Sequence, residues 1–349
     1  MPYLVRLWGN PSSSYHFGVE AKAAIEKARE TIADTLGAEP EEIYFTSGAT
    51  ESNNMVINTY RDRVIATTPI EHHAILRPSL DHAETFYLNI DNTGRVDVED
   101  VEKAIKHLDI GLVSVMAANN EIGTIEPIKE IAQICDSYAI PFHTDATQFY
   151  GHQILNVNEI KADYISASAH KFGGVKGTGF LYVRKNAKIK PLLGGGHQEK
   201  SLRAGTENVF GIVAMAEAAR LSCDRMSLES VRLIELRSYL IKRVLNEIDG
   251  VRLTGNEVYR LPNNASFAFE GIRGEELVEL LGMYNIFCSS GSACETGTDE
   301  PSHVLTAIGL SKELANGSLR LTMGSDTTQE CLDYVIDKLK KSVDMLRNK

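Results

Sequence analysis

The feature that most constrains the fold of this chain is a repeated alternation of short apolar strands with amphipathic helices. The apolar run 43–46 is followed by a turn that contains Gly48, and a helix is predicted from Glu51. Parallel strands need a long crossover, which is usually a helix. The alternation therefore predicts an α/β fold with a mainly parallel sheet covered on both faces. Further strands are predicted at 112–116, 141–144, 164–167 and 179–183, and further helices at 19–36 and 127–138.

A change of pattern in the last third of the chain predicts a second domain. A long charged helix begins near Ser227, and the strands after it are fewer. The chain has 349 residues, which is more than a single core usually supports. We expect a large domain at 10–228 and a smaller α+β C-terminal domain at 229–349, together with 1–9. Its predicted strands are 266–269 and 318–322, and its helices are 274–284 and 329–346.

Composition limits the possible functions. A net charge of -11 argues against a nucleic-acid surface, because non-specific duplex binding depends on Lys and Arg. No apolar run approaches the roughly 20 residues that span a bilayer, and the first residues show no secretory or transit pattern. The five cysteines show no Cys-x-x-Cys pairing, which favours reduced thiols over disulfides or zinc ligands. We expect a cytoplasmic protein without a metal that contacts neither nucleic acid nor membrane directly.

Three polar features follow predicted strands or turns. Lys171 comes just after a buried strand, where a lysine can bind an aldehyde cofactor covalently, although a solvated loop lysine has similar flanks. Asp145 ends another strand, and its carboxylate suits a protonated ring nitrogen, although Asp also caps helices. The turn 47–50 precedes a helix whose positive amino end could hold a phosphate. Together these features indicate a cofactor site at the ends of several strands.

The order of these features resembles the fold-type I pyridoxal-phosphate (PLP) enzymes of the class V aminotransferase branch. The small-residue run that ends in Cys294 resembles the nucleophile loop of the NifS/IscS-like cysteine desulfurases, and the resemblance extends from Gly9 to about Glu330. It implies the PLP-dependent transferase fold of type I, with a seven-stranded type of sheet and pyridoxal 5'-phosphate as cofactor. The motifs that carry it are Phe45–Glu51, Asn119–Gly123, Asp145–Gln148, Ser168–Lys171 and Arg203–Thr206.

The resemblance implies a role for each of several residues. Lys171 would hold the cofactor and carry the substrate α-proton, Asp145 would pair with the ring nitrogen, and Gln148 would hydrogen-bond the phenolic oxygen. His72 matches a ring that stacks on the cofactor and can serve as an acid or base. Thr206 would contact the phosphate across a dimer interface, which implies a homodimer. The other implied cofactor contacts are Ala49, Thr50, Ser168 and His170.

The implied substrate is L-cysteine, and the implied products are L-alanine and a persulfide on Cys294. Asn120 and Arg320 match the groups that hold the substrate carboxylate. Arg320 also alternates with apolar neighbours in its predicted strand, so its side chain should leave the core face. Cys294 stands in a Gly/Ser loop, where a thiol can be exposed. Cys135 and Cys331 are in register with apolar helix positions and are expected in the core.

Other interpretations stay open. The sulfur would pass to an acceptor protein, either an iron–sulfur scaffold or a thiolation relay. A different PLP activity, such as that of an aminotransferase or a selenocysteine or cystine lyase, would not need Cys294. Family members usually carry a further segment before the position of Gly9, and residues 58–64 look shortened. A third interpretation is therefore an N-terminally truncated homologue that is weakly active, or a non-catalytic dimeric partner.

Overall fold

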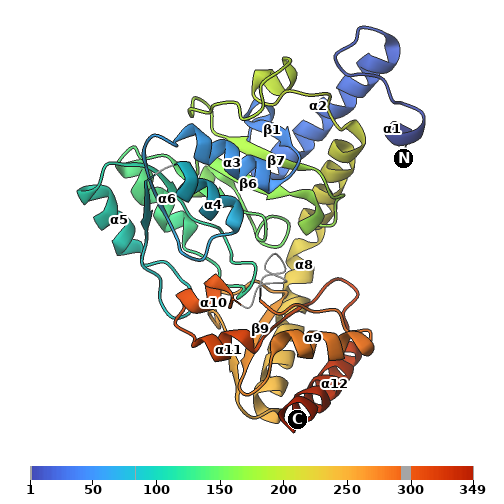
Figure 1. Ribbon diagram of the computed structural model, residues 1–349. Coiled ribbons are helices and arrows are strands. Elements are labelled where there is room, and N and C mark those ends of the chain that lie inside the picture. Colours follow the sequence, from blue (N-terminus) through green and yellow to red (C-terminus); the bar gives the residue numbers. More distant parts are fainter. Residues whose placement is uncertain (1, 83, 292–299, 349) are drawn as a thin grey trace. The chain divides into compact units, whose positions relative to one another are not determined.

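The computed structural model describes residues 2–82, 84–291 and 300–348 (Figure 1). Packing divides the chain into two compact units. Unit 1 comprises Met1–Asn89, Asp97–Ala118 and Pro127–Met226, and unit 2 comprises Ile90–Val96, Asn119–Glu126 and Ser227–Lys349. Residues 1–9 therefore fall in unit 1 rather than with the C-terminal part. The reason is that Gly9 packs on helix α2: a Cβ there would lie 2.4 Å from the carbonyl carbon of Phe17. That the units are folding domains stays a prediction.

Unit 1 is built on a seven-stranded sheet with the strand order β1-β7-β6-β5-β4-β2-β3. Every pairing among β6, β5, β4, β2 and β3 is parallel, whereas β7 is antiparallel to both of its neighbours. β4, β5, β6 and β7 are buried along their whole length, as expected of a sheet with both faces covered. The strands are β1 (Ile43–Thr46), β2 (Val64–Thr67), β3 (Thr85–Tyr87), β4 (Ile110–Ser114), β5 (Phe142–Asp145), β6 (Tyr164–Ser168) and β7 (Gly179–Val183).

The longer helices of unit 1 each bury an apolar face. In α2 (His16–Leu36), Ala21, Ile25 and Ile32 are buried at helical spacing, and the helix ends at Gly37, whose φ is +67°. Helix α3 (Ala49–Thr59) packs on β1, β5, β6 and β7. The remaining elements of unit 1 are α1 (Pro2–Val5), η1 (Pro40–Glu42), α4 (His73–His82), α5 (Val98–His107), α6 (Ile128–Ser137), α7 (Val157–Ile160), η2 (Ala169–Lys171) and η3 (Gln198–Ser201).

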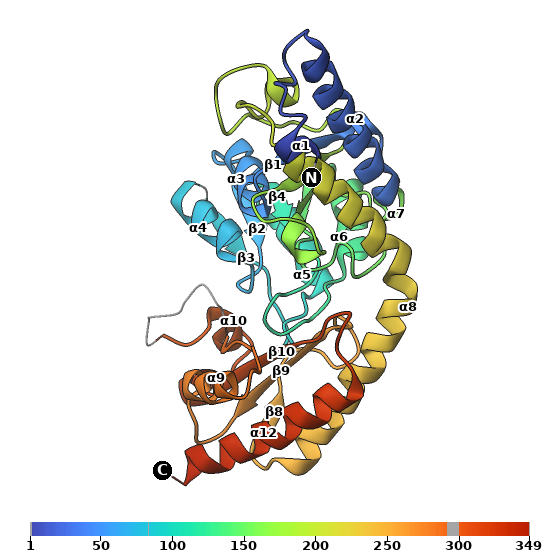
Figure 2. The same cartoon turned by 90° about the vertical axis from the view of Figure 1, so that its right-hand side faces the viewer.

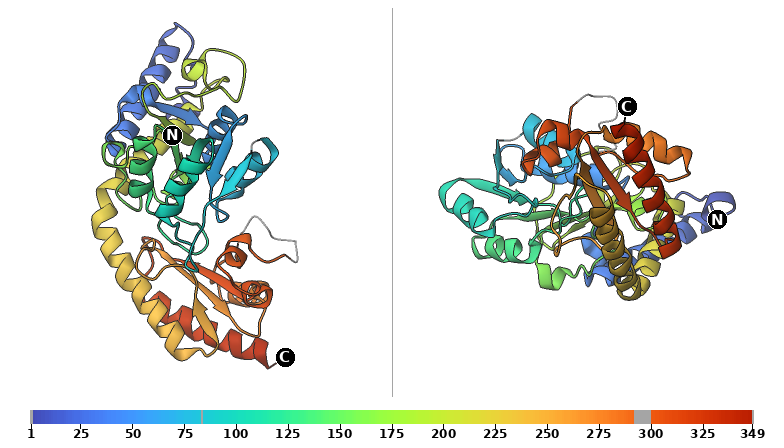
Figure 3. Two further views of the ribbon diagram at one scale, coloured as in Figure 1. Left: turned by 90° about the vertical axis from the view of Figure 1, so that its left-hand side faces the viewer. Right: turned by 90° about the horizontal axis from the view of Figure 1, so that it is seen from below.

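Unit 2 has an antiparallel sheet of β8 (Val251–Leu253), β9 (Asn264–Phe269) and β10 (Ser318–Thr322), with β9 in the centre. Phe267 and Phe269 of β9 belong to the same buried cluster as residues of α9 (Gly274–Met283) and α12 (Gln329–Arg347). Figure 2 and the left view of Figure 3 show these helices beside the sheet. Two short helices, α10 (His303–Ala307) and α11 (Lys312–Asn316), complete the unit.

Helix α8 (Val209–Glu247) is longer than the sequence pattern predicts. It begins at Val209 rather than near Ser227, because Ile212 and Met215 continue the buried stripe toward the amino end. One helix thus runs from unit 1 into unit 2. Among the described helices, none is long and apolar enough to cross a membrane. The described side chains also contain no group of three or more His, Cys, Asp or Glu that could hold a metal ion.

Candidate active site

The amino end of α3 and the end of β6 meet at one edge of the unit 1 sheet. The backbone N–H of Ala49 donates to Ser168 Oγ at 2.8 Å, and both residues are buried. Thr50 follows with an exposed side chain. A Cβ at Gly179 would lie 2.6 Å from Gly48 Cα, so only glycine allows β7 to approach this turn. The structure therefore brings together three of the predicted phosphate contacts at the positive end of a helix.

Asp145 ends β5, two strands from β7 in the same sheet. Its side chain is buried, and Asn53 Nδ2 of α3 donates to Asp145 Oδ2 at 2.6 Å. The N–H of Thr147 donates to Oδ1 at 2.9 Å, so the carboxylate also closes the local turn. Asp145 is therefore fixed by two elements at the carboxyl edge of the sheet, where open α/β sheets bind ligands.

His143 lies fully buried beneath this position in β5. Its Nδ1 lies 2.8 Å from Ser114 Oγ, and its Nε2 lies 3.0 Å from Ser166 Oγ, so both neighbouring strands hold the ring. Burial lowers the pKa of His143 to about 4, against an opposing effect of the nearby Asp145 charge. The imidazole is therefore neutral at physiological pH and joins β4, β5 and β6 through hydrogen bonds.

Lys171 ends η2, three residues after the end of β6, and is exposed. Its backbone carbonyl lies 3.0 Å from His152 Nε2, which anchors the turn. His170 is also exposed, and partial burial together with the charges of Lys171 and Lys176 lowers the pKa of its imidazole. A neutral ring next to two ammonium groups can still donate one N–H to an anion.

Two other predicted residues follow strands of the same sheet. Gln148 is half-buried and comes three residues after Asp145. His72 is half-buried and directly precedes α4, and its Nδ1 accepts the N–H of Ala74 at 3.1 Å. Its neighbour Glu71 is buried and accepts the N–H of Met116 at 2.8 Å. These bonds tie the His72 turn to the segment after β4.

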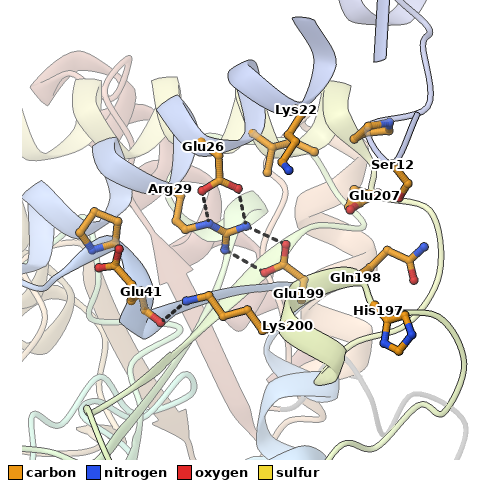
Figure 4. Close-up of a pocket in the computed structure, with 13 residues that line it drawn as sticks. Ser12, Lys22, Glu26, Arg29, Glu41, His197, Gln198, Glu199, Lys200 and Glu207 are labelled. Atoms are coloured by element: carbon orange, nitrogen blue, oxygen red, sulfur yellow. Dashed lines mark hydrogen bonds and ion pairs between the residues drawn. The ribbon is translucent and has the colours of Figure 1, made fainter. Parts of the chain in front are cut away.

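A cavity of about 610 Å³ lies between α2 and the segment that includes η3 (Figure 4). In its wall, Arg29 Nη1 and Nη2 donate to the two carboxylate oxygens of Glu199, each at 2.8 Å. The same guanidinium donates to the carbonyl of Ile43, and Glu199 accepts the N–H of Phe45 at 2.9 Å. Burial lowers the pKa of Arg29, but the bonds and charge of Glu199 outweigh it, so the net pKa is raised. The pair joins α2, β1 and η3.

The segment held by this pair has a strained backbone. Glu199, Lys200 and Ser201 have φ values of 45°, 56° and 68°, a left-handed region that side chains other than glycine rarely adopt. Further along, Arg203 Nε donates to Glu51 Oε1 at 3.0 Å, next to the amino end of α3. Burial raises the pKa of Glu51, but hydrogen bonds from Arg203 and Ser47 lower it by more. Thr206, three residues after Arg203, is exposed.

The predicted carboxylate-binding residues lie together in unit 2. Arg320 of β10 donates from Nη1 to the backbone carbonyl of Asn120 at 2.7 Å. Its backbone pairs with that of Ser289, since the N–H of Arg320 donates to the Ser289 carbonyl at 2.7 Å. The guanidinium is half-buried, as the alternating pattern predicts. A planar guanidinium in this position can bind a carboxylate with two hydrogen bonds.

The cysteines differ in exposure. Cys294 lies outside the described residues. Cys135 is buried, as predicted, and burial raises the pKa of its thiol to about 12. The prediction of a core position for Cys331 is wrong, because this residue is exposed in the first turn of α12. The hydroxyl of Thr328 lies 3.5 Å from its Sγ and lowers the pKa of the thiol.

A family model described as "Aminotransferase class-V" matches residues 1–335. The cysteine desulfurase IscS of Dictyoglomus turgidum is 48% identical and covers 99% of this chain and 90% of its own length. A solved structure of a NifS-like protein has a TM-score of 0.91 and 37% identity, and covers 99% of this chain and 94% of its own. A structure described as SspA in complex with cysteine has a TM-score of 0.78 and 34% identity, and covers 92% of each chain.

The chain belongs to the class V aminotransferase family. Within that family it is a cysteine desulfurase that depends on pyridoxal phosphate, which confirms the predicted cofactor and enzyme class. The structural neighbours also confirm the predicted fold, an α/β architecture with a mainly parallel seven-stranded sheet.

The residues at the sheet edge fit this cofactor. The amino end of α3 offers its positive dipole, and the Ser168 hydroxyl, which accepts the Ala49 N–H, can donate its own proton to a phosphate. The buried Asp145 carboxylate offers a partner for a cationic ring nitrogen. Lys171 offers an exposed amine on the loop after β6. Anion donors, a buried carboxylate and an amine are the chemical groups that pyridoxal phosphate requires.

Sequence reasoning missed the side chains that hold this edge in place. Arg29 is a charged residue in the apolar register of α2, four residues after Ile25 and three before Ile32, and that position was a usable signal. Asn53 also faces inward from α3, toward Asp145. Glu199 had no local signal, because its partner Arg29 is 170 positions away in the sequence.

Proposed function

We propose that this enzyme transfers the sulfur of L-cysteine to Cys294, leaving L-alanine, and that an acceptor protein then takes the sulfur for iron–sulfur cluster assembly or thiolation. The name of the Dictyoglomus turgidum relative supports desulfurase activity. The structural neighbour described in complex with cysteine supports the choice of substrate. The role of Cys294 rests on its sequence context, a Gly/Ser loop in which a thiol can be exposed.

The observation that carries the proposal is the buried Asp145 carboxylate, which is 5% exposed and bonded to Asn53. Asn53 and Thr147 each donate to one carboxylate oxygen and offset part of the cost of burial, and the lone pairs that remain can accept a protonated ring nitrogen. We assign the amine of Lys171 to covalent attachment of the cofactor. The remaining assignments are His72 to stacking on the ring, Gln148 to the phenolic oxygen, and Ala49, Thr50, Ser168 and His170 to the phosphate.

Bound pyridoxal phosphate withdraws electrons from the substrate, so that the bonds at its α- and β-carbons can be cleaved. In unit 2, Arg320 and Asn120 hold the substrate carboxylate. Lys171, as a neutral amine, takes the α-proton, and His72 serves as the second acid or base. The Cys294 thiolate attacks the substrate sulfur: a sulfur–sulfur bond forms, the carbon–sulfur bond breaks, and its electron pair stays with the carbon, which gains a proton. One cysteine and one thiol give one alanine and one persulfide, without an added oxidant or reductant.

The exposed Thr206 belongs to a homodimer in this proposal, in which it reaches the phosphate bound by the partner copy. Mixing two inactive variants, Lys171→Ala and Thr206→Ala, tests this arrangement. If Thr206 acts across the interface, the mixed dimer has one intact site, and alanine formation returns. If Thr206 acts within its own copy, the mixed dimer has no intact site, and no activity returns.

Mass spectrometry of the Cys294 peptide tests the function directly. After incubation with pyridoxal phosphate and cysteine, we expect one added sulfur on this peptide and one alanine formed for each persulfide. Cys294→Ala should form neither product, whereas Cys331→Ala, which removes an exposed thiol elsewhere, should form both. Full alanine formation by Cys294→Ala would contradict the persulfide step and favour another PLP activity. Protein that binds no cofactor would instead support the non-catalytic interpretation.

A further inference from the structure

A tightly held turn, Asn119–Gly123, contains the substrate-binding candidate Asn120. The side chain of Asn119 accepts the N–H of Glu121 at 2.8 Å and that of Ile122 at 3.0 Å. Gly123 has a φ of +73°, and a Cβ there would lie 2.5 Å from Asn264 Cγ in β9. Asn264 Nδ2 also donates to the Glu121 carbonyl at 3.2 Å. The turn is therefore fixed on the central strand of the unit 2 sheet.

The Glu121 side chain is 2% exposed and lies between the two ends of the segment that carries Cys294. After that segment, Ser302 Oγ donates to Glu121 Oε2 at 2.6 Å and also accepts the N–H of Leu305, the first-turn bond of α10. Before it, a Cβ on Gly291 would lie 3.8 Å from Glu121 Oε2 and 3.4 Å from Ser302 Cβ. Residues on both sides of 292–301 thus lie close to one buried carboxylate.

The same turn also holds the candidate substrate-binding arginine. The carbonyl of Asn120, next to Glu121 in the chain, accepts a hydrogen bond from Arg320 Nη1 at 2.7 Å. Arg320 in turn exchanges two backbone hydrogen bonds with Ser289, at 2.7 and 3.3 Å. The turn therefore contacts the guanidinium directly and the Ser302 end through Glu121, whereas the Ser289 end is held on Arg320 by backbone pairing.

We propose that Glu121 is a positioning residue for sulfur transfer, which holds the Ser302 end of the Cys294 segment at a fixed place relative to Arg320. The inference rests on the proposed roles of Cys294 and Arg320. Attack on sulfur requires the thiolate to approach along the carbon–sulfur bond, and a displacement of about 1 Å can cost on the order of a hundredfold in rate. Glu121 acts through the segment and does not itself touch the substrate in this proposal.

Steady-state alanine formation by Glu121→Ala and Ser302→Ala tests the proposal. We expect kcat to fall at least about tenfold in either variant, while KM for cysteine changes less than about threefold, because the bond between Arg320 and the Asn120 carbonyl remains. In the double variant, kcat should fall by a smaller factor than the product of the two factors by which the single variants lower it. Glu121→Gln should recover most of the rate, since its amide oxygen can accept the Ser302 hydroxyl.

A matched control removes another buried carboxylate from the same unit. Glu126 is 2% exposed and accepts the N–H of Val96 at 2.9 Å. Glu126→Ala should therefore keep the kcat of the wild type. If it loses as much kcat as Glu121→Ala does, the loss reflects general destabilisation, and the positioning role is wrong. A rise of KM equal to the fall of kcat would also overturn it, because Glu121 would then act on carboxylate binding.

Hydrogen exchange provides a readout that does not depend on turnover. The amides of 303–307 in α10 should exchange faster in Glu121→Ala than in the wild type, and unchanged exchange would contradict the anchoring role. The outcomes separate this inference from the function on which it rests. If the wild type places no sulfur on Cys294, the proposed function fails. If the wild type does so and Glu121→Ala keeps its kcat, only the positioning role fails.

Discussion

The two units hold their candidate site residues by different means. In unit 1, Asp145 and Ser168 are the last residues of buried strands, and hydrogen bonds from Asn53 and Ala49 fix their side chains. In unit 2, the candidates are a turn residue and an arginine of the edge strand β10, joined by one side chain-to-backbone bond. The first arrangement is part of the sheet, whereas the second depends on a few individual contacts.

The two arrangements suit different roles in the reaction. Groups that end buried strands cannot move without breaking the sheet, which suits a cofactor that stays bound through many turnovers. The groups of unit 2 depend on a few contacts of one turn, so that substitutions there should disturb the substrate and the thiol while the cofactor stays bound. Changes in unit 1 should therefore act mainly on cofactor binding, and changes in unit 2 mainly on cysteine binding and turnover.

The largest expected effect is that of Lys171→Ala. Without the amine, the protein should lose covalent cofactor attachment and the visible absorption that comes with it, and alanine formation should become undetectable. The fold should persist, because the Lys171 side chain is exposed. Absorption spectra and reduction with borohydride followed by peptide mapping measure the attachment. Lys176→Ala, which removes another exposed lysine of the same loop, should keep it. Attachment that survives in Lys171→Ala would point to a different lysine.

The next effect concerns unit 2. Arg320→Ala should raise KM for cysteine at least about tenfold, because a guanidinium bound to a carboxylate contributes roughly 1.5–3 kcal/mol through charged hydrogen bonds. The cofactor absorption should stay as in the wild type. Arg252→Ala, which removes an exposed arginine of β8, is the matched control and should leave KM unchanged. If Arg320→Ala releases the cofactor instead, the proposed division between the units is wrong.

A change in unit 1 far from the substrate should act on stability and on the cofactor. Glu199→Gln leaves the buried Arg29 guanidinium with only the half-exposed Glu26 as a charge partner, and breaking a buried pair typically costs about 3–5 kcal/mol. The left-handed segment 199–201 should then relax, and the cofactor should dissociate faster, with KM for cysteine unchanged. Urea denaturation and the rate of cofactor loss measure the two effects. In Arg29→Met/Glu199→Met, which leaves no buried charge, much of the stability should return. If it does not return, the pair stabilises the protein through its bonds to the Ile43 carbonyl and the Phe45 N–H, which methionine cannot replace.

The sequence predicts the strand-end part of the site better than the rest. Strands β1, β7 and β10 were predicted with the bounds that the structure shows, because each is a compact apolar or alternating run with clear limits. β2 and β3 were missed: β3 has only three residues and none is buried, so the hydrophobic signal is weak. Once the long strands are known, Asp145 and Ser168 follow, since their positions are local consequences of where a strand ends.

What the sequence could not predict are pairings between distant elements. Glu199 contacts Arg29 across 170 positions, and Ser302 contacts Glu121 across 181, so no local pattern reports either pair. Cys331 shows the opposite error. Its register with apolar residues of α12 suggested burial, but it lies in the first turn, where the helix faces solvent before the packed stripe begins at Leu332. Periodicity identifies a face but does not show where along the helix the core ends.

The smallest effect on activity at neutral pH is expected from two buried titratable groups, one in each unit, which act on stability through pH. His143 has a pKa lowered from 6.5 to about 4 by burial, so the unfolded chain binds its proton first as the pH falls. Its contribution to stability is present above 6.5 and declines between 6.5 and 4, by at most about 1.4 kcal/mol per pH unit. His143→Gln should remove this acid-side slope. Urea denaturation at a series of pH values measures it, and an unchanged slope would contradict the assignment.

Glu126 in unit 2 should show the opposite dependence. Burial raises the pKa of its carboxyl from 4.5 to about 8, against the hydrogen bond from the N–H of Val96 and the charge of Arg95. The folded state therefore retains a proton that the unfolded chain releases, and stability declines as the pH rises from 4.5 to 8. Glu126→Gln imitates the protonated carboxyl, so it should remove this slope and be more stable than the wild type at neutral pH. If Glu126→Gln is instead less stable than the wild type at neutral pH, the Glu126 carboxylate is ionised in the folded protein. Both titratable groups would then lower the stability as the pH falls.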